Sequence, residues 1–237
     1  MTKTRRQIEA DLKNVDIVVE IIDARIPVSS RNPDIDSICA GKPRLIVLNR
    51  ADQADPARNK QWAALFRSQG HAVLETDAKT GSGVNQFSAI IQNVLKDQIA
   101  KWREKGQVGR PVRAMVVGVP NVGKSTFINK VARKKSAKAG DRPGVTRGKQ
   151  WVNVDQSLDL LDTPGILWPK FDDQTIGMNL AFTGAVKDDI MDVETLGCHM
   201  MALLAERYPR VLTDSYKLPE VPAREEEEND IAYGYRL

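Results

Sequence analysis

The chain has 237 residues, 41% of them hydrophobic, and its formal net charge of +4 suits a polyanionic partner such as RNA without requiring one. Its two cysteines, Cys39 and Cys198, stand far apart without clustered histidines, which argues against a zinc module or disulfide framework and indicates a reducing compartment. No apolar run is long enough to span a bilayer, and the polar segment 1–14 does not resemble a signal peptide, so we expect a cytoplasmic protein without a membrane partner.

Short β-rich apolar runs alternate with segments of helical spacing in the first part of the chain. The predicted strands are 16–23, 44–50, 71–78, 113–118, 150–155 and 157–162, and the predicted helices are 58–70, 84–105 and 124–135. This alternation favours a mostly parallel sheet covered by helices on both faces. The segment 105–111 contains glycine and proline without apolar periodicity, so we interpret it as a linker between two halves of the pattern.

The last part of the chain changes character, because no strand is predicted after about residue 176. The segments 177–189 and 193–209 have helical spacing, and the acidic run 225–230 is expected to be a solvated or disordered tail. We therefore predict an α/β domain at 1–175 and a small α-helical domain at 176–237.

The segment GVPNVGKS (118–125) matches G-x-x-x-x-G-K-[ST] between a predicted strand and a predicted helix. Its glycines let backbone N–H groups approach phosphates, and the helix N-terminus adds the positive end of its dipole. Lys124 is expected to reach the β- and γ-phosphates, and the Ser125 hydroxyl to ligate Mg²⁺. The sequence thus predicts a phosphate loop whose nucleotide-contacting residues are Pro120, Asn121, Val122, Gly123, Lys124, Ser125 and Thr126.

Two later segments complete the predicted phosphate site. In LDTPG (161–165), Asp162 can hold Mg²⁺ through a water, and the Gly165 N–H can bond a γ-phosphate oxygen. In RPGVTRG (142–148), the Thr146 hydroxyl can complete the Mg²⁺ shell when a γ-phosphate orders the loop. Each segment alone is an ordinary turn sequence, and their place after the phosphate loop supports the interpretation. We expect Lys124, Thr146 and Gly165 to stabilise the reacting phosphates.

The run LIVLNRAD (45–52) ends in Asn-Arg-Ala-Asp, a pattern with which many GTPases recognise guanine. The Asp52 carboxylate can accept hydrogen bonds from guanine N1–H and the exocyclic amine, whereas adenine presents an acceptor at N1, so GTP is favoured over ATP. Asn49 is expected to fasten the neighbouring loops and the base, and the Arg50 stem to lie on the purine.

The segment TDAKTG (76–81) resembles the companion base loop of GTPases. In that loop the Ala78 N–H meets guanine O6 and Lys79 packs on the base, while Asp77 stands where serine is more usual, which leaves its role open.

Both base-reading motifs precede the phosphate loop in this chain. The order of these motifs along the chain does not fix their positions in the sheet. Where the natural termini of a domain lie close together, the chain can be joined there and opened at another loop, and the same loops still meet at the carboxyl edge of the parallel sheet. We therefore predict a three-layer α/β P-loop GTPase domain that is circularly permuted.

The motifs and their order resemble the ribosome biogenesis GTPase A (RbgA/YlqF) family. They include MTKTRRQI, DARIPVSSRNP (23–33), NRAD, DAKTG, GVPNVGKST, PGVTRG and DTPGILWP. The resemblance implies a GTP-driven factor in late assembly of the large (50S) ribosomal subunit, with a helical domain that helps to contact rRNA. It also implies a K⁺ ion seated by Asn121 beside the phosphates. We expect GTP as substrate, GDP as product, Mg²⁺ as cofactor, and a monomer off the ribosome.

The group that orients the attacking water is not found in this sequence. Ile166 stands where many signalling GTPases place glutamine, and an apolar side chain cannot orient water. The resemblance implies a histidine in a Phe-Pro-Gly-His segment before residue 1 and more helix after the last residue, so we expect an incomplete helical domain and slow intrinsic hydrolysis that the ribosomal subunit stimulates. Of the remaining histidines, His71 is expected away from the nucleotide edge and His199 packed and neutral among Met and Leu.

A basic stretch surrounds the Thr146 loop and can either neutralise rRNA phosphates or form a solvated helix face. Its members are Lys130, Arg133, Lys134, Lys135, Lys138, Arg142, Arg147 and Lys149. The tryptophans at 62, 102, 151 and 168 are expected in core or interdomain packing rather than as base-stacking platforms.

Two alternatives to a GTP hydrolase stay open. One is a GTP-dependent RNA- or ribosome-binding module with negligible turnover. The other is an RNA-binding scaffold without nucleotide affinity, which the presence of Lys124, Ser125, Asp162 and Asp52 disfavours.

Overall fold

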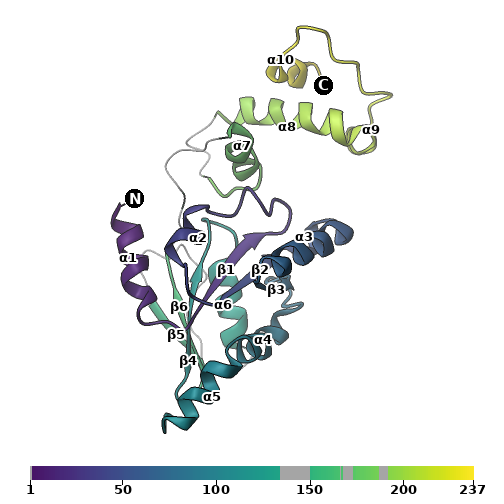
Figure 1. The fold of residues 1–237 in the computed structure, drawn as a ribbon. Coiled ribbons are helices and arrows are strands. Elements are labelled where there is room, and N and C mark those ends of the chain that lie inside the picture. Colours follow the sequence, from purple (N-terminus) through teal and green to yellow (C-terminus); the bar gives the residue numbers. More distant parts are fainter. Residues whose placement is uncertain (1, 134–149, 166, 168–172, 187–191) are drawn as a thin grey trace. The chain divides into compact units, whose positions relative to one another are not determined.

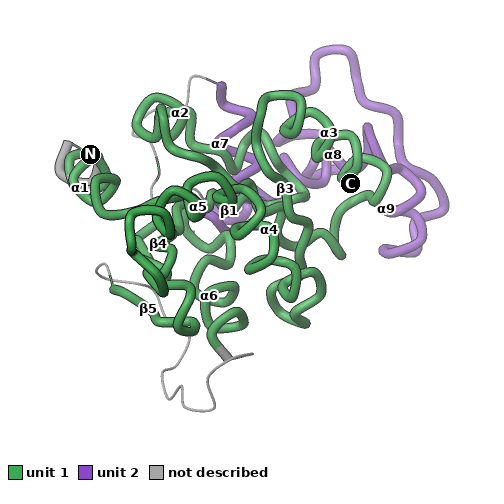
Figure 2. Tube along the Cα trace, turned by 60° about the horizontal axis from the view of Figure 1, so that its bottom comes forward, with its two compact units in different colours: residues 1–172 green, residues 173–237 purple. Residues whose placement is uncertain are grey.

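The computed structural model describes residues 2–133, 150–165, 167, 173–186 and 192–237. It divides into two compact units, residues 1–172 and 173–237, which Figure 2 shows in different colours. The division falls just before a helix, Gln174–Phe182 (α7), whose N-terminus is capped by the Asp173 carboxylate. A boundary after residue 175 would instead cut through the first turn of this helix.

A six-stranded sheet forms the centre of the first unit, with the order β3-β2-β1-β4-β6-β5 (Figure 1). All neighbouring strands are parallel except β5 and β6, which form an antiparallel pair. The strands are Ile17–Asp23 (β1), Arg44–Asn49 (β2), Ala72–Thr76 (β3), Val112–Val117 (β4), Gln150–Asp155 (β5) and Leu158–Asp162 (β6). The six predicted strands and the mostly parallel sheet are confirmed.

The strand order shows how the chain is arranged around β1. β2 and β3 lie on one side of β1, and β4 pairs with its other side, with Ile17 opposite Ala114. The chain is therefore made of two consecutive half-sheets joined along β1 and β4.

The helices of this unit are Thr2–Leu12 (α1), Asp34–Ile38 (α2), Pro56–Ser68 (α3), Phe87–Val94 (α4), Lys96–Glu104 (α5) and Lys124–Arg133 (α6), with short 3-10 turns at Ala51–Gln53 (η1) and Val84–Gln86 (η2). All of these α-helices except α5, which has no buried residue, contribute buried apolar side chains to the core. Ile8 of α1 joins a buried cluster with Val18, and Phe66 of α3 joins another with Ile22. Because Val18 and Ile22 lie four residues apart on β1, both clusters occupy one face of the sheet.

Several sequence expectations in this unit need correction. Residues 2–12, read only as a polar segment, form α1, since Ile8 and Leu12 recur on one helical face and are buried. The predicted helix 84–105 is interrupted at Leu95, whose ψ of 12° departs from helical geometry while its side chain stays buried.

The tryptophans occupy different environments. Trp62 stacks on Phe66 with ring centroids 6.0 Å apart, as expected for a packing role. A place in the core was wrong for Trp151, which is 48% exposed on β5 and lies under the Arg113 guanidinium. An edge strand leaves one face of such a side chain without neighbours, which sequence spacing does not reveal. Trp168 lies outside the described residues.

The second unit is helical. Its helices are α7, Val193–Arg207 (α8), Pro209–Tyr216 (α9) and Asp230–Arg236 (α10). The predicted helix 177–189 ends early, at Phe182, because Gly184 adopts a positive φ of 70°, and residues 187–189 are not described. Nowhere in the described part of the chain is a helix both long and apolar enough to cross a membrane.

The acidic run 225–230 is solvent-exposed at residues 225–227, as expected, but it is not a disordered tail, because it leads into α10. Glu228 pairs with Arg236, and the Asn229 side chain caps α10 by accepting a hydrogen bond from the Ala232 N–H at 2.9 Å. Arg224 bridges Glu206 and Asp230, with both contacts at 2.6 Å. The run is ordered because nearby arginines balance its charge and Tyr233 of α10 is buried in a cluster with Ala202 and Leu212.

The core of the first unit yields a stability prediction. Phe87 of α4 meets Phe127 of α6 edge to face, with ring centroids 5.0 Å apart, and both are fully buried. We expect Phe87→Ala to lower the free energy of unfolding by about 3–5 kcal/mol, as measured by urea denaturation. Leu65→Ala, at a position 44% exposed on α3, serves as the control and should cost less than about 1 kcal/mol. Equal losses for the two variants would contradict the packing described.

Candidate guanine-nucleotide site

The predicted motifs meet at one edge of the sheet. Asp23 at the end of β1 pairs in register with Asn49 at the end of β2, which pairs with Thr76 at the end of β3. On the other side of β1, Val116 of β4 pairs with Asp162 at the end of β6. Because these strands are parallel, the loops that follow them lie side by side, as ligand-binding loops do in open α/β sheets.

The phosphate-loop segment between β4 and α6 forms a tight turn. Gly118 has a φ of 153°, and a Cβ there would lie 2.3 Å from the Ile21 carbonyl oxygen. Gly123 has a φ of 100°, and a Cβ there would lie 2.4 Å from Asn49 Nδ2. Both positions therefore require glycine, and the loop leads directly into α6 at Lys124.

Lys124 is buried within this loop, with 7% of its surface exposed. Its Nζ donates hydrogen bonds to the carbonyl oxygens of Gly118 at 3.2 Å and Val119 at 2.8 Å. Burial lowers the pKa of Lys124 to about 8, although the nearby Asp162 carboxylate opposes this shift. A buried ammonium of this kind gains from an anionic ligand, since burial has removed the water that would otherwise solvate its charge.

Ser125 and Asp162 approach each other across the loop. The Ser125 hydroxyl donates to Asp162 Oδ2 at 3.4 Å, and Asp162 is almost fully buried at the end of β6. A hydroxyl and a carboxylate are oxygen ligands of the kind Mg²⁺ prefers, so the pair fits the expected ion. The described residues contain no group of three or more His, Cys, Asp or Glu that could hold a metal by themselves. The partners of such an ion would therefore include phosphate and water oxygens.

The segment after β6 is anchored to the phosphate loop. The Thr163 hydroxyl donates to the Val116 carbonyl at 2.7 Å. A Cβ on Gly165 would lie 2.7 Å from the backbone nitrogen and Cα of Pro120, so only glycine allows this approach. Gly165 thus lies against the loop, as a backbone donor to a terminal phosphate would need to.

Asn49 connects three loops by its buried side chain. Its Nδ2 donates to the Val122 carbonyl of the phosphate loop at 2.8 Å. Its Oδ1 accepts from the Ala78 N–H at 3.0 Å and from the Thr76 hydroxyl at 3.3 Å. The Ala78 N–H, expected to meet guanine O6, is thus already bonded to Asn49, and a purine oxygen would have to share or replace this bond. Asp52 lies exposed in η1, three residues beyond Asn49.

Arg50 adopts an arrangement that the sequence did not suggest. It has a left-handed φ of 60°, and its guanidinium donates to Asp23 Oδ2 at 3.2 Å and to the Asn121 carbonyl at 2.8 Å. Asp23 and its neighbour Arg25 were not predicted as site residues. The available signal was a carboxylate at the end of a mostly apolar strand, two residues before Arg25 in the DARIPVSSRNP segment.

Asp77 organises the loop after β3. Its Oδ1 accepts from the Lys79 N–H at 2.8 Å, and its Oδ2 accepts from the Thr80 N–H and hydroxyl. Burial would raise the pKa of Asp77, but these hydrogen bonds outweigh it and hold the pKa below its usual value. Asp77 therefore shapes the turn itself, while Lys79 is exposed and its carbonyl accepts from Lys130 Nζ at 3.1 Å.

The other predicted site residues differ in exposure. Pro120 is half-buried, Val122 is buried, and Asn121 and Thr126 are exposed along the loop and at the start of α6. Thr146, Ile166 and most of the basic stretch lie outside the described residues. His71 directly precedes β3, so it lies at the opposite end of the strand from the nucleotide edge, as expected.

Comparison with known proteins identifies the family. A family model described as 50S ribosome-binding GTPase matches residues 113–208. The chain is 48% identical over 222 residues to ribosome biogenesis GTPase A of Bacillus cereus, covering 94% of this chain and 75% of that protein. For ribosome biogenesis GTPase A of Priestia megaterium, the identity is 49% over 223 residues, covering 94% and 77%. The chain belongs to the ribosome biogenesis GTPase A family.

Solved structures agree with this assignment. The crystal structure of GNP-bound YlqF from T. maritima matches with a TM-score of 0.59 and 28% identity, covering 92% of this chain and 78% of that chain. The GDP-bound form of that protein matches with a TM-score of 0.60 and 26% identity, covering 97% and 90%. The predicted fold, a circularly permuted P-loop GTPase domain, is thereby confirmed for this member of the ribosome biogenesis GTPase A family.

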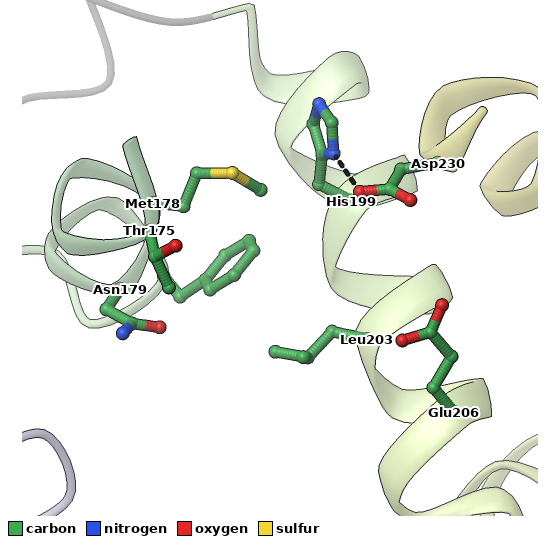
Figure 3. A pocket seen from close by; sticks show the side chains of 8 residues that line it. Thr175, Met178, Asn179, His199, Leu203, Glu206 and Asp230 are labelled. Carbon is green, nitrogen blue, oxygen red and sulfur yellow. Dashed lines mark hydrogen bonds and ion pairs between the residues drawn. The ribbon is translucent and has the colours of Figure 1, made fainter. Parts of the chain in front are cut away.

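A separate hollow of about 170 Å³ lies within the helical unit of this family member (Figure 3). His199 was expected among apolar neighbours, but its Nδ1 lies 3.2 Å from Asp230 Oδ2. The hollow is lined by Thr175, Met178, Asn179, Phe182, His199, Leu203, Glu206 and Asp230. None of these is a predicted nucleotide-contacting residue.

The buried Lys124 predicts a pH dependence of stability in nucleotide-free protein. Its pKa is about 8 in the folded chain and 10.5 without the fold, so below pH 8 the charged form penalises folding, and the penalty fades as pH rises from 8 to 10.5. We expect Lys124→Met to raise the free energy of unfolding by about 1–3 kcal/mol at pH 7, with the gain shrinking by pH 10.

The measurement is urea denaturation of both proteins at several pH values. Thr126→Val, which alters no titratable group at an exposed position of the same helix, is the control and should differ from the parent by the same amount at every pH. A Lys124→Met protein that is less stable at pH 7, or a difference independent of pH, would contradict the burial penalty.

Proposed function

We propose that this chain binds and hydrolyses GTP during late assembly of the large ribosomal subunit. The observation that carries the proposal is the buried Asn49 side chain, which bonds the phosphate loop at Val122 and the base loop at Ala78 and Thr76. A ligand that has both a base and phosphates explains why these loops are fixed to one another. Membership of the ribosome biogenesis GTPase A family makes that ligand a guanine nucleotide.

The predicted site residues have the following proposed roles in this reaction. Asp52 accepts from guanine N1–H and the exocyclic amine, and Lys124 moves from its carbonyl partners to the β- and γ-phosphates. Ser125 and Asp162, together with Thr146, hold Mg²⁺, which neutralises developing phosphate charge when bound. Gly165 donates its N–H to the γ-phosphate.

A K⁺ ion beside the phosphates is also part of the proposal. The exposed Asn121 has a left-handed φ of 56° in the middle of the phosphate loop, and its side-chain oxygen is a suitable ligand. Such a cation would supply charge where other GTPases use an arginine. The group that orients the attacking water is not assigned to any described residue.

The names of the relatives support the ribosomal part of the proposal. The matched family model is described as 50S ribosome-binding, and the relatives from Bacillus cereus and Priestia megaterium are named for ribosome biogenesis. Basic residues outnumber acidic ones in 1–172, whereas acidic residues outnumber basic ones in 173–237. We therefore propose rRNA contacts mainly through the GTPase unit, by phosphate neutralisation. We also propose a cytoplasmic location and a monomer away from the ribosome.

Turnover measurements test this proposal. We expect slow GTP hydrolysis by the chain alone and at least about tenfold faster hydrolysis with large ribosomal subunits, with higher rates in K⁺ than in Na⁺ buffer. Lys124→Ala is the control for contaminating activity. Rates equal to this control under every condition, with GTP still bound, would favour the alternative of a binding module with negligible turnover. Absence of GTP and GDP binding would contradict the proposal altogether.

Guanine recognition by Asp52 gives a second test. Asp52→Asn replaces a carboxylate acceptor by an amide that donates, so we expect GTP affinity to fall by about tenfold or more and affinity for xanthosine triphosphate to rise. Asp55→Asn is a matched control, because Asp55 caps α3 and asparagine caps a helix equally well. Calorimetric titration of the two variants decides the point, and unchanged GTP affinity in Asp52→Asn would remove Asp52 from the site.

A further inference from the structure

Asp23 carries an unusual number of hydrogen bonds for one buried carboxylate. Oδ1 accepts from the Arg25 N–H and Nε, both at 3.0 Å, while Oδ2 accepts from Arg25 Nη2 at 2.7 Å and Arg50 Nη1 at 3.2 Å. The residue is 3% exposed. Two guanidinium groups thus hold one carboxylate at the nucleotide edge of the sheet, and charge-assisted bonds of this kind are the stronger ones.

The position of Asp23 in the sheet explains what it can reach. It ends β1, the strand that pairs with both β2 and β4. The base-reading segment follows β2, and the phosphate loop follows β4. A side chain at the end of β1 therefore stands between the two loops that must bind opposite ends of one nucleotide.

Arg50 makes the connection between these loops. One nitrogen of its guanidinium bonds Asp23, and the other bonds the Asn121 carbonyl of the phosphate loop at 2.8 Å. Both Arg50 and Asn121 have left-handed φ values, of 60° and 56°, which non-glycine residues adopt at an energetic cost. The surrounding bonds must offset this cost, and the Arg50 bond acts directly on the strained Asn121.

The arginine depends on Asp23 for its orientation. A long side chain that is 29% exposed would otherwise sample several rotamers and contact the Asn121 carbonyl only part of the time. The planar guanidinium can bond both acceptors at once, which the single ammonium of a lysine does less well. Asp23 thereby preorganises Arg50, and Arg25 fixes Asp23 from its other side.

We propose that Asp23 is a positioning residue of the nucleotide site, which acts through Arg50 to hold the phosphate loop at Asn121 in register with the base-reading segment. This inference rests on the proposed binding of a guanine nucleotide. It gives Asp23, the first residue of the DARIPVSSRNP segment, a role in retaining the nucleotide. Loss of Asp23 should therefore act mainly on nucleotide release.

The test is the release rate of a fluorescent GDP analogue from the full chain, followed by stopped flow. We expect Asp23→Asn to release it about tenfold faster than the parent protein, since a charged hydrogen bond that holds the loop is lost. Asp16→Asn is the matched control. Asp16 is also buried, precedes the same strand at its other end, and pairs with Arg110 at 2.9 Å. This control should lose stability and keep the parent release rate within about twofold.

A double-mutant cycle separates positioning from a general structural effect. In an Arg50→Ala background, Asp23→Asn should change release by less than about twofold, because the residue it orients is gone. An equal acceleration in both backgrounds, or no acceleration by Asp23→Asn in the parent, would overturn the proposal. If Asp23→Asn does not fold, Arg50→Lys replaces it with an expected acceleration of about threefold, and an unchanged rate would overturn the proposal.

The same assay distinguishes this inference from the proposed function. If the parent chain binds no GDP, the proposed function fails. If the parent binds GDP and Asp52→Asn weakens that binding while Asp23→Asn does not alter release, only the role of Asp23 is wrong.

Discussion

The parallel pairing of β1 with β4 is the constraint on which the rest of the molecule depends. Residues 17–20 of β1 lie in register with residues 114–117 of β4, and this seam joins the half-sheet that carries the base-reading loops to the half-sheet that carries the phosphate loop. In a circularly permuted domain the two halves are consecutive in the chain. The relative position of base and phosphate loops is therefore set by strand register across the seam, and only then refined by Asn49 and Arg50.

Burial of polar groups at the nucleotide edge of the sheet lowers stability and prepares the site for a charged ligand. Lys124 is desolvated between carbonyl oxygens, and Asp162 is buried at the end of β6, so both incur a cost in folding that a bound nucleotide and its cation would offset. The Asn49 side chain does not carry this cost, because both its Nδ2 and its Oδ1 have hydrogen-bond partners within the protein. The site thus combines an amide that fixes the loops with buried charged groups whose desolvation a charged ligand would offset.

Much of this arrangement was predictable from sequence because its signals are local. The apolar runs of the six strands and the glycine spacing of the phosphate loop are two such signals. The missed contacts depend on tertiary structure. The bond from Arg50 to Asp23 joins residues 27 positions apart, and no spacing rule relates them. The acidic run before α10 was mistaken for a tail because Arg224 and Arg236 become its partners only in the folded unit. Trp151 was assigned to the core because edge and central strands have similar sequences.

The permutation also determines which element follows the segment proposed to contact the γ-phosphate. After β6 the chain passes Gly165, whose backbone lies against Pro120 of the phosphate loop, and it reaches the helical unit at Asp173. In the unpermuted order a strand of the same sheet would follow this segment and would hold its far end in place. Here β6 is the last strand in the described part of the chain, so no strand of this sheet is described after Gly165. The next described helix is α7, so the proposed γ-phosphate contact and the helical unit follow one another along the chain.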